Sequence, residues 1–238
     1  MLMNKTLYFS FFFFFIPIFT CENTSFILKE STASTLINLG GDCQLAWQTR
    51  ENGLRRYAFP FDSVVAPCDS VTQALQNKFQ NFFDRENLVL VKNDEGRPLH
   101  VLDTKYNIRF IHDWGDKIPE NFLEQYTTIK EIYDRRILRL LSLLDQEKSF
   151  LFMRKNIQKE EAKRLKIALE LICGQKKFRL VALDTTNEIK ENWNIDKIHN
   201  YYLRQPEPYE WTGDNQAWKD IFTSEGLFLG TREQSTAL

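Results

Sequence analysis

Apolar residues near the start of the folded part of the chain form a short run followed by helical spacing. The run Thr35–Leu39 is closed by Gly40-Gly41, which predicts a buried strand that ends in a tight turn. From Gln44 to Gly53 apolar residues recur at helical intervals, with Asp42 in the N-cap position and a glycine at the end. The pattern therefore places Cys43 at or near the N-terminus of a helix, directly after a strand.

The same patterns predict further elements in the middle of the chain. We expect helices over 70–83 and 119–147, the latter as one long helix or two, and strands over 88–91 and 106–111. A turn is expected at 93–96, and the segment 57–62 is expected to be a loop that packs back on the sheet.

The last third of the chain shows a strand, a helix and a second strand in close succession, over 149–153, 159–171 and 178–183. This succession is typical of a right-handed crossover between parallel strands. We therefore expect a single α/β domain over residues 35–230, with a mainly parallel or mixed central sheet flanked by helices.

The first 25 residues form a separate unit. Lys5 precedes an apolar run from Leu7 to Phe19, and small and polar residues follow. This order is typical of a secretory signal peptide, and the run is shorter than the roughly 20 apolar residues of a membrane-spanning helix. The segment predicts a secreted or periplasmic protein. The alternative is an uncleaved anchor that holds the protein at a membrane through this segment alone.

The composition of the chain excludes some classes of binding partner. The chain has 238 residues, of which 31 are Lys or Arg and 32 are Asp or Glu, so no excess of positive charge would attract nucleic acid. The four cysteines are scattered and form no CxxC pair or Cys/His spacing. We therefore expect no metal, no cofactor and no nucleic-acid partner.

Each of three residues follows the carboxyl end of a predicted strand: Cys43, His112 and Asp184. Their thiol, imidazole and carboxylate groups together suffice for catalysis by a cysteine nucleophile. In open α/β sheets ligands bind at that edge. A thiol at a helix N-terminus has a lowered pKa, and the N–H groups there can hold an oxyanion. An imidazole would take the thiol proton while a carboxylate orients the ring. Asp184 is the candidate for that third role, and Asp113 and Asp62 are the alternatives.

An ordered series of short segments also carries a resemblance. The series consists of Leu39 to Gln44 (LGGDCQ), Pro60 to Asp62 (PFD), Phe110 to Asp113 (FIHD), Tyr133 with Arg135, Arg136 and Arg139, and Phe150 to Phe152 (FLF). It resembles a domain family of unknown function whose members are regarded as papain-like cysteine peptidases. The resemblance implies a peptide or other acyl-bearing substrate, Cys43 as nucleophile and His112 as general base. Gln44 and Gly41, with Asp62 and Asp113, would then lie near the oxyanion or the substrate.

Two alternatives remain open. Gly41-Asp42-Cys43 is also similar to the Gly-Asp-Ser block of SGNH-type esterases, in which case Asp196 and His199 would match their Asp-x-x-His block. The third hypothesis is a non-catalytic carbohydrate- or protein-binding module in which Cys43 is buried. The histidine that lies beside the Cys43 sulfur distinguishes the two hydrolases from each other.

Overall fold

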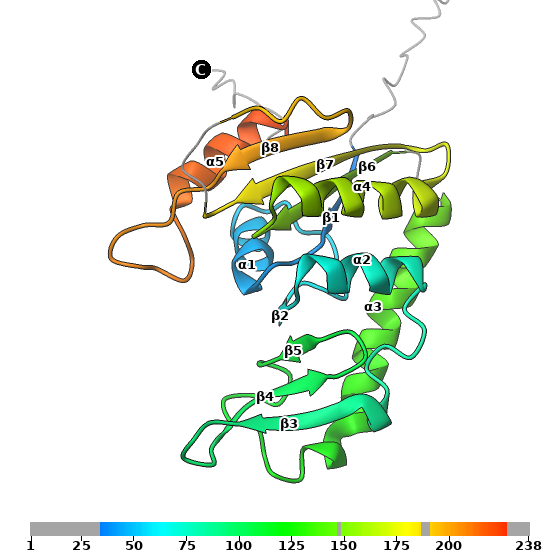
Figure 1. Ribbon diagram of the computed structural model, residues 1–238, viewed down its shortest axis with the longest axis vertical. Helices are drawn as coiled ribbons and strands as arrows, with labels where there is room; N and C mark the ends of the chain where they lie inside the picture. Colours follow the sequence, from blue (N-terminus) through cyan, green and yellow to red (C-terminus); the bar gives the residue numbers. More distant parts are fainter. Residues whose placement is uncertain (1–33, 147–148, 187–190, 228–238) are drawn as a thin grey trace, which may run out of the picture. The chain divides into compact units, whose positions relative to one another are not determined.

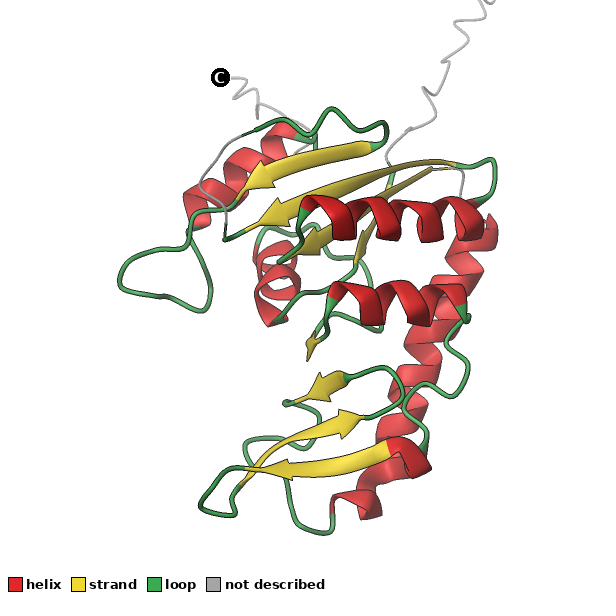
Figure 2. Ribbon diagram, viewed as in Figure 1, coloured by secondary structure: helices red, strands yellow, loops and turns green. Residues whose placement is uncertain are grey.

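A computed structural model describes residues 34–146, 149–186 and 191–227, and within these ranges the strands form two four-stranded sheets (Figures 1 and 2). The first sheet is parallel, in the order β1-β6-β7-β8. Its strands are β1 (Thr35–Asn38), β6 (Ser149–Lys155), β7 (Lys177–Asp184) and β8 (Ile198–Tyr202).

Alternate side chains of the parallel sheet enter two different cores, as the two-residue period of a strand requires. On β6, Phe150 and Phe152 face the core shared with α2 (Cys68–Gln76) and α4 (Lys159–Cys173). Leu151 and Met153 face the core shared with α1 (Cys43–Glu51) and α5 (Asn215–Ser224). Because helices cover both faces, β6 is an almost continuous apolar run.

The second sheet is antiparallel, in the order β2-β5-β4-β3. Its strands are β2 (Val64–Val65), β3 (Leu88–Lys92), β4 (Pro98–Asp103) and β5 (Ile108–Phe110). A short 3-10 turn (Phe122–Gln125) leads into the long helix α3 (Tyr126–Gln146), which Figure 1 shows in green running from this sheet toward the parallel one. A bridge between Gly41 and Val65 joins the two sheets.

Aromatic rings fix α3 on the antiparallel sheet. The ring of Phe83 lies 4.7 Å from that of Phe110 and 5.0 Å from that of Tyr133, centroid to centroid. All three side chains are fully buried. Edge-to-face and stacked ring pairs of this kind add stability beyond the apolar area that they bury.

The prediction of an α/β domain with a parallel sheet and flanking helices is confirmed. The strands expected at 35–39, 149–153 and 178–183 and the helices expected at 44–53 and 159–171 lie where the sequence patterns place them. Of the helix expected over 70–83, only the part up to Gln76 forms. It ends there because the chain then turns through left-handed conformations, at Lys78 and Phe79 among others.

The antiparallel sheet is the main departure from the prediction. The segment expected as a strand over 106–111 does contain β5, but β5 pairs with β2 and β4 and not with the parallel sheet. The premise that His112 shares a sheet edge with Cys43 and Asp184 is therefore wrong. Strand β8 and helix α5 were not predicted either.

The predicted signal segment, residues 1–25, lies outside the described residues. Among the residues that the structure describes, no helix combines the length and the apolar character needed to cross a bilayer.

Candidate active site

The turn between β1 and α1 can be made only by glycine. Gly40 and Gly41 have φ angles of +74° and +125°, and a Cβ on Gly40 would lie 2.6 Å from the carbonyl oxygen of Phe61. A Cβ on Gly41 would overlap the carbonyl oxygen of Lys155. The Lys155 N–H donates to the carbonyl of Gly40 at 3.0 Å, so the turn extends the pairing of β1 with β6. The first residues of α1 are thereby held against the end of β6.

Asp42 caps the helix and ties it to β6. Its Oδ1 accepts a hydrogen bond from the Gln44 N–H at 3.0 Å, as an N-cap side chain does. Its Oδ2 accepts from Lys155 Nζ at 2.5 Å and from Asn156 Nδ2 at 3.2 Å. The Lys155 side chain is nearly fully buried, so this ion pair sits at the base of the helix and not on the surface.

Cys43 is the first residue of α1 and is half-buried. Burial raises the pKa of its thiol, and so does the neighbouring Asp42 carboxylate, while its own backbone N–H and Lys155 act in the opposite direction. The expectation of a lowered Cys43 pKa is therefore wrong, because burial and Asp42 outweigh the opposite effect of the backbone N–H at the helix N-terminus. No histidine is among the described groups that shift this pKa.

Cys43 differs from the other two described cysteines in accessibility. Cys68 and Cys173 are 1% and 3% exposed, and burial raises the pKa of each to about 11. All three are free thiols. Because solvent access is needed for a thiol to react, Cys43 is the most available of the thiols in the described part of the chain.

A loop over 204–214 is fastened to α1 by two buried glutamines. Gln44 Nε2 donates to the Trp211 carbonyl at 2.8 Å and to Gln205 Oε1 at 3.4 Å, and Gln48 Nε2 donates to the Thr212 carbonyl at 2.7 Å. The amide and the N–H of Gln44, both candidates for an oxyanion contact, therefore already have acceptors. The loop brings Tyr209 near the site, because the charges of Asp42 and Cys43 add to the effect of burial in raising the pKa of Tyr209.

His112 lies in a different cluster, beyond the end of β5. It is exposed, and its neighbour Asp113 is half-buried and accepts a hydrogen bond from the Tyr133 hydroxyl at 2.9 Å. Burial raises the pKa of Asp113, while Tyr133, Arg136 and His112 lower it. The structure thus places His112 beside Asp113 and next to α3.

Asp62 belongs to the same neighbourhood. Its side chain is fully buried and accepts from the Phe59 N–H at 2.8 Å and from Arg55 at 3.0 Å. Burial raises the pKa of Asp62 as well, and Arg55 and then Arg136 oppose that rise. Arg136 therefore acts electrostatically on both Asp62 and Asp113. The sequence segments that carry the family resemblance include all three residues, but they do not reveal that Arg136 lies near both carboxylates.

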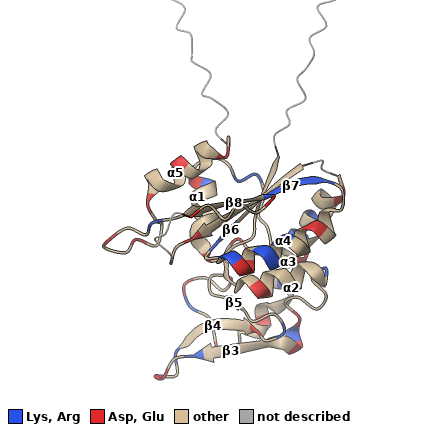
Figure 3. Cartoon of the chain, turned by 45° about the horizontal axis from the view of Figure 1, so that its top comes forward, with Lys and Arg blue, Asp and Glu red and all other residues tan. Residues whose placement is uncertain are grey.

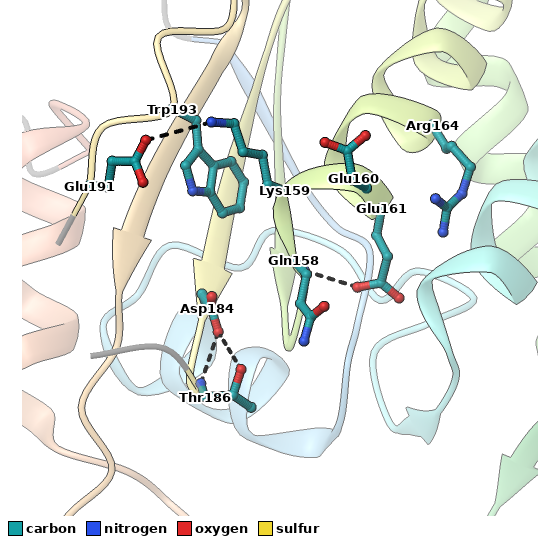
Figure 4. Close-up of a pocket in the computed structure, with 9 residues that line it drawn as sticks. All are labelled: Gln158, Lys159, Glu160, Glu161, Arg164, Asp184, Thr186, Glu191 and Trp193. Carbon is teal, nitrogen blue, oxygen red and sulfur yellow. Dashed lines mark hydrogen bonds and ion pairs between the residues drawn. The ribbon is translucent and has the colours of Figure 1, made fainter. Parts of the chain in front are cut away.

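Asp184 ends β7 and faces α4. Its Oδ1 accepts from the Thr186 N–H at 2.8 Å and from the Thr186 hydroxyl at 2.9 Å. It lines a pocket of about 660 Å³ (Figure 4). The lining residues are Gln158, Lys159, Glu160, Glu161, Arg164, Asp184, Thr186, Glu191 and Trp193.

The Cys43 and Asp184 neighbourhoods are linked through hydrogen bonds. The Thr185 hydroxyl donates to Asn156 Oδ1 at 2.8 Å, and Asn156 Nδ2 donates to Asp42. Lys155 and Asn156, which sequence reasoning did not name, therefore connect the nucleophile candidate to the edge of β7. A signal was available, because Lys155 ends a buried strand as Asp184 does, and Asn156 follows it directly.

The alternative histidine, His199, has a different partner. Its Nδ1 lies 2.9 Å from Oε1 of Glu225, just beyond α5, and the Tyr201 hydroxyl donates to the same oxygen at 2.6 Å. It lies on β8, which β6 and β7 separate from β1, while Asp196 precedes that strand. Within the described ranges, no three His, Cys, Asp or Glu side chains gather in a way that could hold a metal ion.

Comparison with known proteins places the chain in a family. No solved structure matches it. The uncharacterized protein R408 of Acanthamoeba polyphaga mimivirus is 21% identical over 222 residues, which cover 82% of this chain and 100% of that protein. Residues 34–186 match the family described as "putative papain-like cysteine peptidase", a span that includes Cys43, His112 and Asp184. The chain belongs to this family.

Proposed function

We propose that the protein is a thiol hydrolase that cleaves amide bonds in peptides or related acyl compounds, with Cys43 as its nucleophile. The observation that carries the proposal is the position of this thiol. It is half-buried, it is the first residue of a helix, and it follows the carboxyl end of a parallel strand. The family description supports a peptidase at the level of the family.

The surroundings of Cys43 define what the chemistry requires. Because burial and Asp42 raise its pKa, the thiol holds its proton at rest, and a base has to remove it before the sulfur attacks a carbonyl carbon. Lys155 and the N-terminal N–H of α1 favour the thiolate once it forms. Attack then yields an acyl-enzyme and a free amine, and water releases the acid in a second step.

We retain His112 as the proposed general base. Its imidazole is exposed and can reach a substrate, and Asp113 lies next to it as a carboxylate that could orient the ring. Because the structure places His112 in a different cluster from Cys43, this role requires the imidazole and the Cys43 sulfur to come together when substrate binds.

These roles are tested by incubating a peptide library with the wild-type protein and with three variants: His112→Ala, His199→Ala and Cys43→Ala. We expect Cys43→Ala to abolish cleavage and His112→Ala to reduce it by about 100-fold, the usual loss when a general base is removed. His199→Ala is the matched control, because His199 is also partly exposed but is bound to Glu225. If His199→Ala caused the larger loss, the esterase-like alternative would replace this proposal.

The binding-module alternative draws on one observation. Tyr57, Tyr209 and Trp211 are 45%, 69% and 49% exposed, and exposed aromatic rings commonly mark a binding surface. Wild-type protein that binds the library without cleaving any peptide would favour this alternative.

We also propose that the chain is exported, on the strength of its N-terminal sequence. Expression in a secretory host should yield a mature protein that begins between Thr20 and Ser25, which N-terminal sequencing would show. An intact N-terminus on membrane-bound protein would instead indicate an anchor.

A further inference from the structure

The pocket beside Asp184 has features of a side-chain binding site. It is a hollow of about 660 Å³ at the carboxyl edge of β7, between the start of α4 and the segment that precedes β8. Figure 4 shows the Trp193 indole above Asp184, with Gln158 beside Asp184 on the side of α4. An aromatic wall and a carboxylate floor suit a flat or elongated cationic group.

The walls of this pocket are held in place before any ligand arrives. The backbone N–H of Trp193 donates to Asn200 Oδ1 at 2.9 Å, and Asn200 Nδ2 donates to the backbone carbonyl of Glu191 at 2.8 Å, which fastens the backbone of this segment to β8. On the other side, the Gln158 N–H donates to Glu161 Oε2 at 2.9 Å as part of a capping box. The backbone that carries Trp193 and the first turn of α4 is therefore ordered before a ligand binds, which reduces the cost of ordering these segments on binding.

The charge balance of the pocket favours a cation. Four carboxylates line it against two cations, Lys159 and Arg164. Both of these cations already face carboxylates, since Lys159 lies 3.7 Å from Glu191 and Arg164 makes a paired contact with Asp69 outside the pocket. Figure 3 shows acidic and basic positions intermixed over α4 and α2. Among the described lining residues carboxylates outnumber cations, although Lys163, outside the pocket, pairs with Glu160 at 2.6 Å.

The pocket also lies on the same sheet edge as the proposed nucleophile. Thr185, next to Asp184, hydrogen-bonds to Asn156, and Asn156 hydrogen-bonds to Asp42, the residue before Cys43. A substrate bound at Cys43 could therefore extend a side chain toward Asp184.

We propose that this pocket binds the cationic side chain of a substrate residue, an arginine or a lysine, with its charge over the Trp193 ring and toward Asp184. The proposal deepens the hydrolase function and rests on it for the role of the pocket. The binding step itself does not depend on catalysis, so the two can be tested apart.

The binding test uses the full chain carrying Cys43→Ala, titrated by calorimetry with N-acetyl-arginine amide. The control ligand is N-acetyl-citrulline amide, which has nearly the same shape without the charge. We expect the arginine compound to bind about tenfold more tightly than the citrulline compound, the equivalent of one ring contact and one partly exposed charge interaction. Equal affinity for the two ligands, or no binding of the arginine compound, would overturn the proposal.

Two variants assign the effect to this pocket. Asp184→Asn keeps an acceptor for Thr186 while it removes the charge, and Trp193→Leu removes the aromatic face but keeps an apolar side chain. Each should reduce the preference for arginine about fivefold or more. Leu99→Ala, at an exposed apolar residue of β4 outside the pocket, is the control and should leave the preference unchanged. If Trp193→Leu fails to fold, Asp184→Asn alone decides, and an unchanged preference in that variant contradicts the proposal.

Catalysis is then measured separately with wild-type protein and paired arginyl and citrullyl aminomethylcoumarin substrates. Charge-dependent binding in the Cys43→Ala protein together with an inactive wild type would retain the pocket and refute the hydrolase. Cleavage of both substrates at the same rate, without charge-dependent binding, would retain the hydrolase and refute the pocket.

Discussion

The hydrogen bond between Tyr133 and Asp113 offers a quantitative test of the cluster that contains His112. Tyr133 is fully buried, and its hydroxyl donates to Asp113 Oδ1 at 2.9 Å. The other Asp113 oxygen is buried and has no hydrogen-bond partner among the described residues. Tyr133→Phe keeps the ring contacts with Phe83 and Phe110 and removes only the hydroxyl.

The expected loss depends on pH because the acceptor is ionisable. Burial raises the pKa of Asp113 above its unfolded value, so its stabilising contribution is complete below that unfolded value and is lost as the pH rises through the folded pKa. The Tyr133 hydrogen bond limits this loss, since it lowers the Asp113 pKa. While Asp113 is ionised the hydrogen bond contributes about 1.5–3 kcal/mol, and once Asp113 is protonated it contributes about 0.5–1.5 kcal/mol, so its contribution falls as the pH is lowered through the folded Asp113 pKa.

Urea unfolding of wild type and Tyr133→Phe, followed by circular dichroism at about pH 7 and at a pH below about 4, measures this difference. We expect the variant to lose about 1.5–3 kcal/mol of unfolding free energy at neutral pH and clearly less in acid. Tyr126→Phe is the matched control, because the Tyr126 hydroxyl only accepts a bond from the exposed Arg85 N–H. An equal loss at both pH values would refute the reasoning that a half-buried, ionisable Asp113 depends on Tyr133.

Two further predictions concern the start of α1. Asp42→Asn should lower the Cys43 pKa, because it removes the neighbouring negative charge while the helix cap remains. Iodoacetamide should then label Cys43 faster at neutral pH, as measured by mass spectrometry. A slower labelling rate would contradict this prediction. Gly41→Ala should destabilise the fold by at least about 3 kcal/mol, since both its φ angle and the Lys155 carbonyl exclude a Cβ. Gly53→Ala, which has a φ of +67° but open space around it, should cost only about 1 kcal/mol in the same thermal unfolding assay, and equal losses would contradict the argument.

Local signals explain why the β1–α1 unit could be predicted from the sequence. The glycine pair, the Asp42 cap and the helical spacing that follows act within a dozen residues of one another, and each depends only on neighbours in the chain. The strand–helix–strand unit of β6, α4 and β7 has the same property, with apolar runs inside both strands and a capping box at Gln158.

The antiparallel sheet could not be predicted in this way. Strand β2 has two residues, and β5 has three that alternate apolar and charged in the same way as an edge strand of either sheet would. What decides the sheet to which β5 belongs is its pairing with Val64 and with β4, and that information lies in distant contacts. The position of His112 could not be predicted for the same reason. The sequence shows that His112 follows a strand, but it does not show to which sheet that strand belongs.

The central claim, that Cys43 is the nucleophile of an acyl-transfer reaction, is tested most directly by trapping the acyl-enzyme. Wild-type protein is mixed with an activated peptide ester, quenched in acid within the first turnover and mapped by mass spectrometry. The account predicts one acyl group on Cys43 and none on the buried Cys68 and Cys173, and no adduct in Cys43→Ala. Hydrolysis of the ester at an undiminished rate in Cys43→Ala, or an acyl group on another residue, would contradict it.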